Sequence, residues 1–367
     1  MILPDTLCSD AVALRSERLQ VVVLPQEGGR IASIVDRQTG AEFLLQPDAA
    51  YHRKEPSGLW SAFETSACAG IVDCLPTVGS CGPEAPGGPV PDHGDFWRLA
   101  WTVKPIADDQ AILLSATGYS RTLSFEKRLS LRGSTLEINN SIRNFGYIAT
   151  PFLYAWHPLF AVDEGDCIVL PGEISLLQVQ YSRRERLGKA GAVVAWPCPS
   201  GSGLKFDLSR VGSIEDSTAD MLYTGRVESG WCALYRARIG QSVTVRFDPR
   251  QLPYLGLWLC YGGWPEDNAR PRQYAVAFEP TVAPRGTLSA ASEAGQAPTL
   301  GAGESFSFDL SLECSGPLAL TCDKFAADAR NQPYTVPAAT KGSPAPWPQP
   351  GKSDVMALIS ACMRKGH

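Results

Sequence analysis

The sequence predicts an all-β protein built from antiparallel strands. Hydrophobic residues alternate with polar ones in many short stretches, and Gly, Pro, Asn and Asp separate these stretches. Such period-two patterns bounded by turn residues are typical of strands. Helical periodicity is scarce, so the pattern favours a β-sandwich or barrel over a fold in which strands and helices alternate.

The expected strands follow one another along most of the chain. The first pair is Leu19–Leu24 and Ile31–Asp36, joined by a turn over Pro25–Arg30. Alternation is strict near residue 310, where Phe306, Phe308 and Leu310 fall on one face. The remaining expected strands cover residues 96–104, 121–131, 136–142, 243–247, 255–259 and 274–278.

Two stretches are predicted to be long loops. Residues 64–95 and 261–272 are rich in Gly and Pro, and long ordered loops in compact domains are often functional. We expect one β domain over residues 1–316 and a Pro-rich extension over 317–367. Within the extension, residues 331–351 resemble a linker, and Asp354–Lys365 could form a short helix with Ser353 as its N-cap.

Charge and apolar content limit the partners. The formal net charge is −5, with both signs mixed along the chain, so we expect no nucleic-acid partner. No stretch has the roughly 20 apolar residues of a membrane span, and the N-terminus lacks the pattern of a signal peptide. These features predict a cytoplasmic protein with no membrane partner. The oligomeric state does not follow from the sequence.

The 11 cysteines are scattered, which favours reduced side chains used as small apolar residues. Cys68, Cys74, Cys81 and His93 form the closest group. Their spacing differs from the two to four residues that usually separate paired zinc ligands. We therefore expect no metal site.

Two residues stand out as candidates for acid–base chemistry. His157 lies in an almost wholly apolar stretch, TPFLYAWHPLFAV, and Glu279 ends an apolar run just before Pro280. A buried carboxyl or imidazole has a shifted pKa and can serve in proton transfer. The structural alternatives are a core histidine bonded to a backbone carbonyl, and a carboxylate paired with an arginine.

Three further residues are candidates for sugar contacts. Trp264 follows two glycines in the second loop and could stack on a sugar ring, whereas Trp258, beside leucines, could equally be a core residue. His93, in PDHGDFWR, could bind a hydroxyl group or instead order its loop through Asp92 and Asp95.

Taken together and in this order, several segments resemble the aldose 1-epimerase (galactose mutarotase-like) family. They are VVVLPQEGGRIASIVDRQTGAEFL near the start, DHGDFWRLAWTV, AWHPLFAV, and LPYLGLWLCYGGW followed by AFEPTVAP. The resemblance spans roughly residues 15–315. It implies a large supersandwich of antiparallel sheets with a sugar cleft on one face, and neither a metal nor an organic cofactor.

The resemblance also implies roles for individual residues. Glu279 would be the base and His157 the acid, while His93 and Arg98 match positions that contact the ligand. The sequence departs from the family after His157, where Pro158-Leu159-Phe160 replaces Tyr-Phe or a close variant followed by Asn. The family's sugar-binding aspartate has no clear counterpart, and the candidates are Asp216, Asp220 and Asp248.

The residues and the resemblance together predict an enzyme that interconverts the α and β anomers of a free aldose. A non-catalytic carbohydrate-binding protein of the same fold is one alternative. An epimerase for a modified or phosphorylated sugar is another, for which Arg30, Arg98 and the group Arg183, Arg184 and Arg186 are available. A glycosidase domain would need a second catalytic carboxylate beside Glu279.

Overall fold

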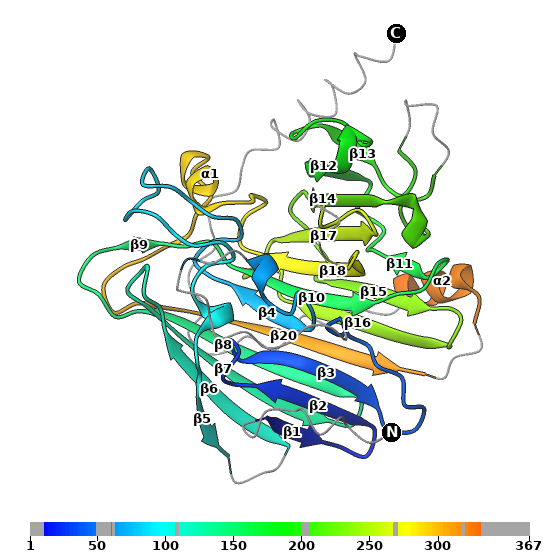
Figure 1. Cartoon of the computed structure of the whole chain (residues 1–367), viewed down its shortest axis with the longest axis horizontal. Helices are drawn as coiled ribbons and strands as arrows, with labels where there is room; N and C mark the ends of the chain where they lie inside the picture. Colours follow the sequence, from blue (N-terminus) through cyan, green and yellow to red (C-terminus); the bar gives the residue numbers. More distant parts are fainter. Residues whose placement is uncertain are drawn as a thin grey trace.

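Two large antiparallel sheets form the body of the protein (Figure 1). The computed structural model describes residues 11–48, 60, 63–106, 110–199, 206–266, 271–316 and 320–331. One sheet has ten strands in the order β1-β2-β3-β4-β10-β18-β17-β14-β12-β13, and the other has eight in the order β11-β15-β16-β20-β8-β7-β6-β5. The short strands β19 and β9 form a small separate pair. The predicted all-β antiparallel architecture is confirmed.

The strands of the ten-stranded sheet are β1 (Val12–Arg15), β2 (Leu19–Leu24), β3 (Arg30–Asp36), β4 (Ile71–Cys74), β10 (Ala155–Ala161), β12 (Leu176–Ser182), β13 (Val193–Ala195), β14 (Thr218–Thr224), β17 (Tyr254–Tyr261) and β18 (Tyr274–Thr281). The eight-stranded sheet contains β5 (Thr102–Pro105), β6 (Ala111–Thr117), β7 (Leu123–Arg132), β8 (Thr135–Asn144), β11 (Cys167–Val169), β15 (Trp231–Arg236), β16 (Gln241–Phe247) and β20 (Ser305–Ser315). The small pair is β9 (Thr150–Pro151) and β19 (Thr299–Leu300).

Helical segments are few in the part of the chain that the structure describes. They are α1 (Leu288–Glu293), α2 (Cys322–Asn331) and the 3₁₀ turns η1 (Phe63–Thr65), η2 (Phe96–Arg98), η3 (Arg183–Glu185) and η4 (Ile214–Asp216). Helix α2 packs Phe325 and Ala326 on β11 and β15, and the ring of Phe325 stacks on Tyr235 at 4.7 Å. Figure 1 shows α2 beside these two strands.

Two expectations from the sequence were wrong in detail. Residues 96–104 were expected to form one strand, but Phe96–Arg98 is a 3₁₀ turn and only Thr102–Pro105 is extended. The turn lets both Phe96 and Trp101 enter the core, where the Trp101 indole donates to the Phe96 carbonyl at 3.0 Å. Residues 64–95 were expected to be loop throughout, yet Ile71–Cys74 forms β4 in the ten-stranded sheet, between β3 and β10.

Two predictions fall outside the described residues. These are the terminal helix over Asp354–Lys365 with Ser353 as its N-cap, and nearly all of the expected linker over residues 331–351. Helix α2 itself was not anticipated by the sequence analysis.

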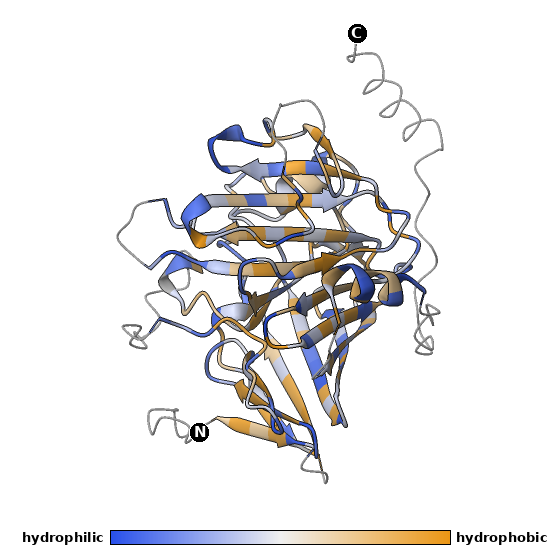
Figure 2. Ribbon diagram, turned by 90° about the vertical axis from the view of Figure 1, so that its right-hand side faces the viewer, coloured by the Kyte–Doolittle hydropathy of each residue, from blue (hydrophilic) through white to orange (hydrophobic). Residues whose placement is uncertain are grey.

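The core lies between the two sheets. The strands that line it bury one face against the core and leave the other face more exposed. In β20, buried and more exposed residues alternate along the whole strand. Figure 2 shows hydrophobic and hydrophilic residues alternating along several strands. Strand β18 differs, because all its residues after Tyr274 are buried. A strand covered on both faces can hold a functional side chain out of bulk water on the face away from the core.

A buried ion pair joins the two sheets within this core. Lys127 in β7 pairs with Asp73 in β4, and both residues are 1% exposed. The other oxygen of Asp73 accepts a hydrogen bond of 2.8 Å from the Tyr154 hydroxyl. Lys127 also lies 5.1 Å from the centre of the Trp101 ring. The pair is therefore enclosed, and both oxygens of Asp73 accept a hydrogen bond, which offsets part of the cost of burying two charges.

We expect Lys127→Met to lower the free energy of unfolding by about 3–5 kcal/mol, because the Asp73 carboxylate would remain buried without its counter-charge. Adding Asp73→Asn should recover part of this loss, because the second charge is then removed as well. Urea unfolding of the three proteins measures both effects. A single variant as stable as the wild type would show that the ion pair does not hold the sheets together.

Candidate functional site

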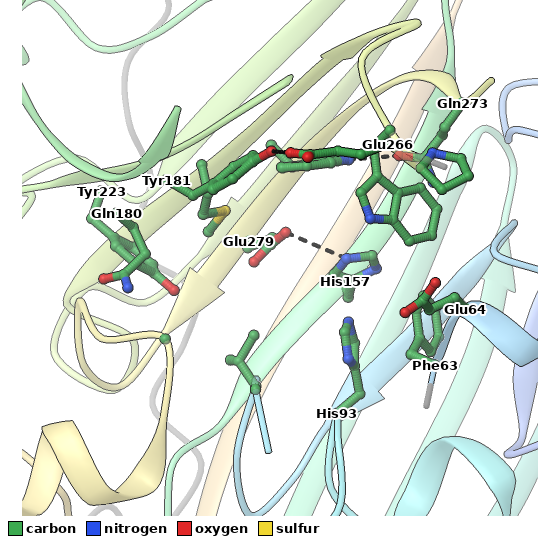
Figure 3. A pocket seen from close by; sticks show the side chains of 17 residues that line it. Phe63, Glu64, His93, His157, Gln180, Tyr181, Tyr223, Glu266, Gln273 and Glu279 are labelled. Atoms are coloured by element: carbon green, nitrogen blue, oxygen red, sulfur yellow. Dashed lines mark hydrogen bonds and ion pairs between the residues drawn. The ribbon is translucent and has the colours of Figure 1, made fainter. Parts of the chain in front are cut away.

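A cavity of about 600 Å³ opens on the face of the ten-stranded sheet that is turned away from the core (Figure 3). Its walls combine strands β10, β12, β14, β17 and β18 with loop residues far away in the sequence. The lining residues are Phe63, Glu64, Val78, Gly79, His93, His157, Gln180, Tyr181, Met221, Tyr223, Trp258, Trp264, Pro265, Glu266, Gln273, Glu279 and Gly286. Both candidates for acid–base chemistry are among them.

Strand register brings His157 and Glu279 together. Strands β10 and β18 are antiparallel, with Ala155 opposite Thr281 and Leu159 opposite Ala277. His157 therefore lies opposite Glu279, and directly opposed side chains in antiparallel strands share a face. The imidazole Nε2 lies 3.6 Å from the carboxyl Oε1. Figure 3 shows the two side chains meeting at the centre of the cavity.

Burial sets the charge of this pair. It raises the pKa of Glu279 to about 8, because a charged carboxylate is poorly solvated there. It lowers the pKa of His157 to about 3, with a further contribution from nearby His93. At neutral pH the pair therefore holds a single proton, carried by the carboxyl group, while the imidazole is neutral.

Each member of the pair also has a buried polar atom to spare. Among the described residues, neither Oε2 of Glu279 nor Nδ1 of His157 has a hydrogen-bond partner. Glu279 is 1% exposed and His157 is 8% exposed. In the described part of the chain, the charged partner of Glu279 is His157 and not an arginine. Buried polar atoms without partners are expected where a ligand or water completes the site.

Gly256 keeps the floor of the cavity open. It lies opposite Glu279 in the neighbouring strand β17. A Cβ atom at this position would come within 2.8 Å of the Met221 Cε atom and 3.1 Å of the Glu279 Cβ atom. The absence of a side chain therefore leaves room for Met221, Tyr223 and the carboxyl group on the same face.

His93 enters the cavity from the long loop before β5. Its ring stacks on Phe63 at 4.0 Å between centroids and meets His157 edge to face at 5.3 Å. The Asp92 carboxylate lies 3.0 Å from Nδ1 of His93 and also accepts the Phe63 backbone N–H. Asp92 thus orders the loop, as the structural interpretation of PDHGDFWR expected, while His93 also lines the cavity.

Aromatic and amide groups form the opposite wall. The Trp258 indole donates to Gln273 Oε1 at 2.6 Å, and its ring lies 6.3 Å from the ring of Tyr181. The Tyr181 hydroxyl donates to Glu266 Oε1 at 2.5 Å. Trp264 lines the same cavity from the loop after β17. Both tryptophans singled out in the sequence are therefore at the site, and Trp258 is fixed by a hydrogen bond.

Arg98 lies elsewhere. Its guanidinium group lies 4.4 Å from the centre of the Trp97 ring, and Arg98 is not one of the residues that line the cavity. The other arginines considered for a phosphate group have different contacts. Arg30 pairs with Glu27, Arg186 with Asp220, and Arg183 donates to the Ser217 carbonyl.

None of the three candidate aspartates lines the cavity either. Asp220 alternates with Met221 along β14, so its side chain points to the opposite face, where Arg186 and Ser182 bind it. Asp216 caps the 3₁₀ turn η4, and Asp248 follows a strand of the other sheet and pairs with Arg250. The polar groups that do face the cavity include Gln180, Glu266 and Gln273.

Gln180 and Tyr181 were missed because their position depends on an irregularity in β12. Consecutive residues of a regular strand face opposite sides, yet both of these line the cavity. The pairing of β12 with β14 shifts between Val179 and Tyr181, as expected for a bulge. Alternation in the sequence LLQVQYS gives no sign of this shift.

The cysteine-rich segment is not arranged around a metal. Cys74 and Cys81 are buried and Cys68 is partly buried. Over the described ranges, no group of three or more His, Cys, Asp and Glu side chains could hold a metal ion. Within the same ranges, the helices are all too short or too polar to cross a membrane.

Comparison with known proteins identifies the fold. No family model matches the sequence, and no curated protein matches it. Among solved structures, Slr1438 from Synechocystis sp. PCC 6803 is similar with a TM-score of 0.62 and 16% identity, over 86% of this chain and 98% of that one. A galactose mutarotase-like protein from Lactobacillus casei ATCC 334 has a TM-score of 0.58 and 16% identity, over 83% of this chain and 100% of that one.

A galactose mutarotase related enzyme from Lactobacillus acidophilus is similar to the same degree, with a TM-score of 0.60 and 15% identity over 84% of this chain and 98% of that one. These structures match nearly their full length. The chain therefore has the galactose mutarotase-like fold that its sequence motifs resembled.

The charge of the central pair predicts how stability depends on pH. Because folding raises the pKa of Glu279 from 4.5 to about 8, its contribution to stability is lost as pH rises toward 8. His157, whose pKa is lowered from 6.5 to about 3, acts in the opposite direction, but only below about pH 6.5. Between about pH 6.5 and 8 we therefore expect the wild type to lose up to about 1.4 kcal/mol per pH unit relative to Glu279→Gln.

Urea unfolding of both proteins across this interval measures the difference, since all other titrating groups are shared. Parallel curves would mean that Glu279 is already ionised in the folded protein.

Proposed function

We propose that this protein is an aldose 1-epimerase-type enzyme, which interconverts the α and β anomers of a free aldose. The observation that carries the proposal is the carboxyl–imidazole pair at the floor of the cavity, with Nε2 of His157 3.6 Å from Oε1 of Glu279. Anomer exchange requires one group to remove a proton and another to donate one. The similarity to galactose mutarotase-like structures supports the same class of reaction.

The proposed reaction needs two proton transfers for ring opening and two for ring closure. Glu279, as carboxylate, removes the proton from the C1 hydroxyl, while protonated His157 donates to the ring oxygen, and the C1–O5 bond breaks. Rotation about the C1–C2 bond presents the other face of the carbonyl group, and the two transfers run in reverse. Neither a redox partner nor a phosphate donor enters this scheme.

The resting charge state fits this cycle. The reactive form, a carboxylate beside an imidazolium, contains the same single proton as the resting form, a carboxylic acid beside a neutral imidazole. Moving that proton from Glu279 to His157 converts one form into the other without exchange with solvent. A sugar hydroxyl that donates to Oε2 of Glu279, and a sugar oxygen that accepts from the Nδ1–H of His157, would both stabilise the charged form. The resting form is also the state expected after ring opening.

The remaining lining residues supply binding. Trp264 and Trp258 offer flat apolar faces for the sugar ring, and His93 is held by Asp92 in position to bind a hydroxyl group. The amides of Gln180 and Gln273 can both donate and accept, which suits sugar hydroxyls. We assign to these amides and to Glu266 the recognition that an aspartate was expected to provide.

We expect Glu279→Gln to slow enzyme-dependent anomer exchange by about 10²–10⁴-fold, because the amide keeps the shape of the carboxyl group but cannot exchange the proton. NMR exchange spectroscopy or polarimetry on freshly dissolved α-D-glucose and α-D-galactose measures the rate. Glu137→Gln is the matched control, since Glu137 lies on β8 of the other sheet with 44% of its side chain exposed. The control should retain the wild-type rate.

A near-normal rate in Glu279→Gln would remove this residue from the mechanism. A wild-type protein that binds sugar in calorimetry without accelerating exchange would contradict the enzymatic proposal and favour a carbohydrate-binding protein.

The single shared proton also predicts the pH dependence of the rate. The pair holds one titratable proton between about pH 3, the pKa of His157, and about pH 8, the pKa of Glu279. After subtraction of the spontaneous rate, kcat/KM should be level around neutrality and fall about tenfold per pH unit above pH 8. A value of kcat/KM that stays level well above pH 8 would contradict this charge assignment.

A further inference from the structure

Two cysteines meet where helix α2 joins the eight-stranded sheet. Cys167 begins β11 and is buried, whereas Cys322 is the first residue of α2 and is partly exposed. The Cys167 Sγ atom lies 3.8 Å from the Cys322 carbonyl oxygen, and the Cys322 Sγ atom lies 3.6 Å from the carbonyl oxygen of Gly165. Neither residue lines the sugar cavity.

We propose that Cys167 and Cys322 form a reversible disulfide that fastens helix α2 to the eight-stranded sheet when the protein meets a low-molecular-weight disulfide. The reciprocal contacts place each sulfur against the backbone that carries the other. Such proximity is the first requirement for a disulfide, which spans only a short distance between two Cα atoms. The proposal is independent of the sugar chemistry.

The surroundings give the two thiols different roles. Cys322 is partly exposed at the first residue of helix α2, so a small disulfide can reach its sulfur. Burial raises the pKa of the Cys167 thiol to about 12, with a smaller contribution from Cys322, while Arg210 acts in the opposite direction. Cys322 is therefore the thiol that attacks first, and Cys167 is the one that resolves the mixed disulfide.

The exchange balances as two substitutions at sulfur. The Cys322 thiolate attacks one sulfur of the small disulfide, forms a mixed disulfide and releases one small thiolate. The Cys167 thiol then gives up its proton and attacks the Cys322 sulfur, which releases the second small thiolate. Two protein thiols are oxidised and the small disulfide is reduced to two thiols, which take up both protons.

The bond would strengthen a contact that is otherwise small. Helix α2 is held by the apolar contacts of Phe325 and Ala326 and by an exposed ion pair between Asp323 and Arg210. Just before the helix, the Tyr235 hydroxyl donates to the Leu320 carbonyl at 2.7 Å. A short helix with few buried residues opens more readily than a central strand. A covalent link at its first residue removes that opening, so the helix stays docked.

The test incubates the full-length protein with oxidised glutathione and then maps its peptides by mass spectrometry. We expect a peptide pair joined through Cys167 and Cys322, with an intact mass lower by about 2 Da for the two hydrogens removed, and reversal by dithiothreitol. Cys198→Ser should give the same linked pair, because exposed Cys198 takes no part. Cys167→Ser should instead accumulate a glutathione adduct at Cys322.

Limited trypsin digestion gives a second readout, since Lys324 and Arg330 are exposed on α2. Oxidised wild type should be cleaved at these sites more slowly than reduced wild type, and Cys322→Ser should show no such difference. Exposed Cys198 reports whether the glutathione was active. A sample in which Cys198 carries glutathione but Cys167 and Cys322 are not linked would overturn the proposal. Equal cleavage of α2 before and after the link forms would overturn its role as a fastener.

Discussion

The register between β10 and β18 is the constraint on which the candidate site depends. It sets His157 against Glu279 on the face of the sheet that is turned away from the core. A slip of one residue would send one of the two side chains to the opposite face. Gly256 adds to this arrangement from the next strand, because the space above it is filled by the groups that line the cavity. The chemistry of the site is therefore a property of three adjacent strands.

Burial then sets the protonation of these groups. The same exclusion of water that raises the pKa of Glu279 lowers that of His157, and the pair becomes neutral as a whole while still holding one transferable proton. Such a pair costs less free energy to bury than two separate charges. Lys127 and Asp73 are also buried, but they keep both charges, and the Tyr154 hydroxyl donates to Asp73. This ion pair joins the two sheets.

The two sheets carry the cavity and the cysteine pair on different surfaces. The ten-stranded sheet is covered by loops from distant parts of the chain, including the segments of His93 and Trp264, and it holds the cavity. The eight-stranded sheet carries helix α2 on β11 and β15, with the two cysteines at their junction (Figure 1). Sugar chemistry and thiol exchange would therefore occupy separate surfaces of one β-sandwich.

The sequence by itself determined the fold class, because alternation with period two is a local property that each strand displays in its own residues. It also singled out His157 and Glu279, since an ionisable residue within an apolar run is visible without any structure. Only the tertiary structure showed that these two are neighbours and that Asp220 forms an ion pair with Arg186. It also showed that a bulge turns both Gln180 and Tyr181 toward the cavity. The physical reason is that a wall built from distant segments depends on strand register and on which face each residue occupies, and local sequence specifies neither.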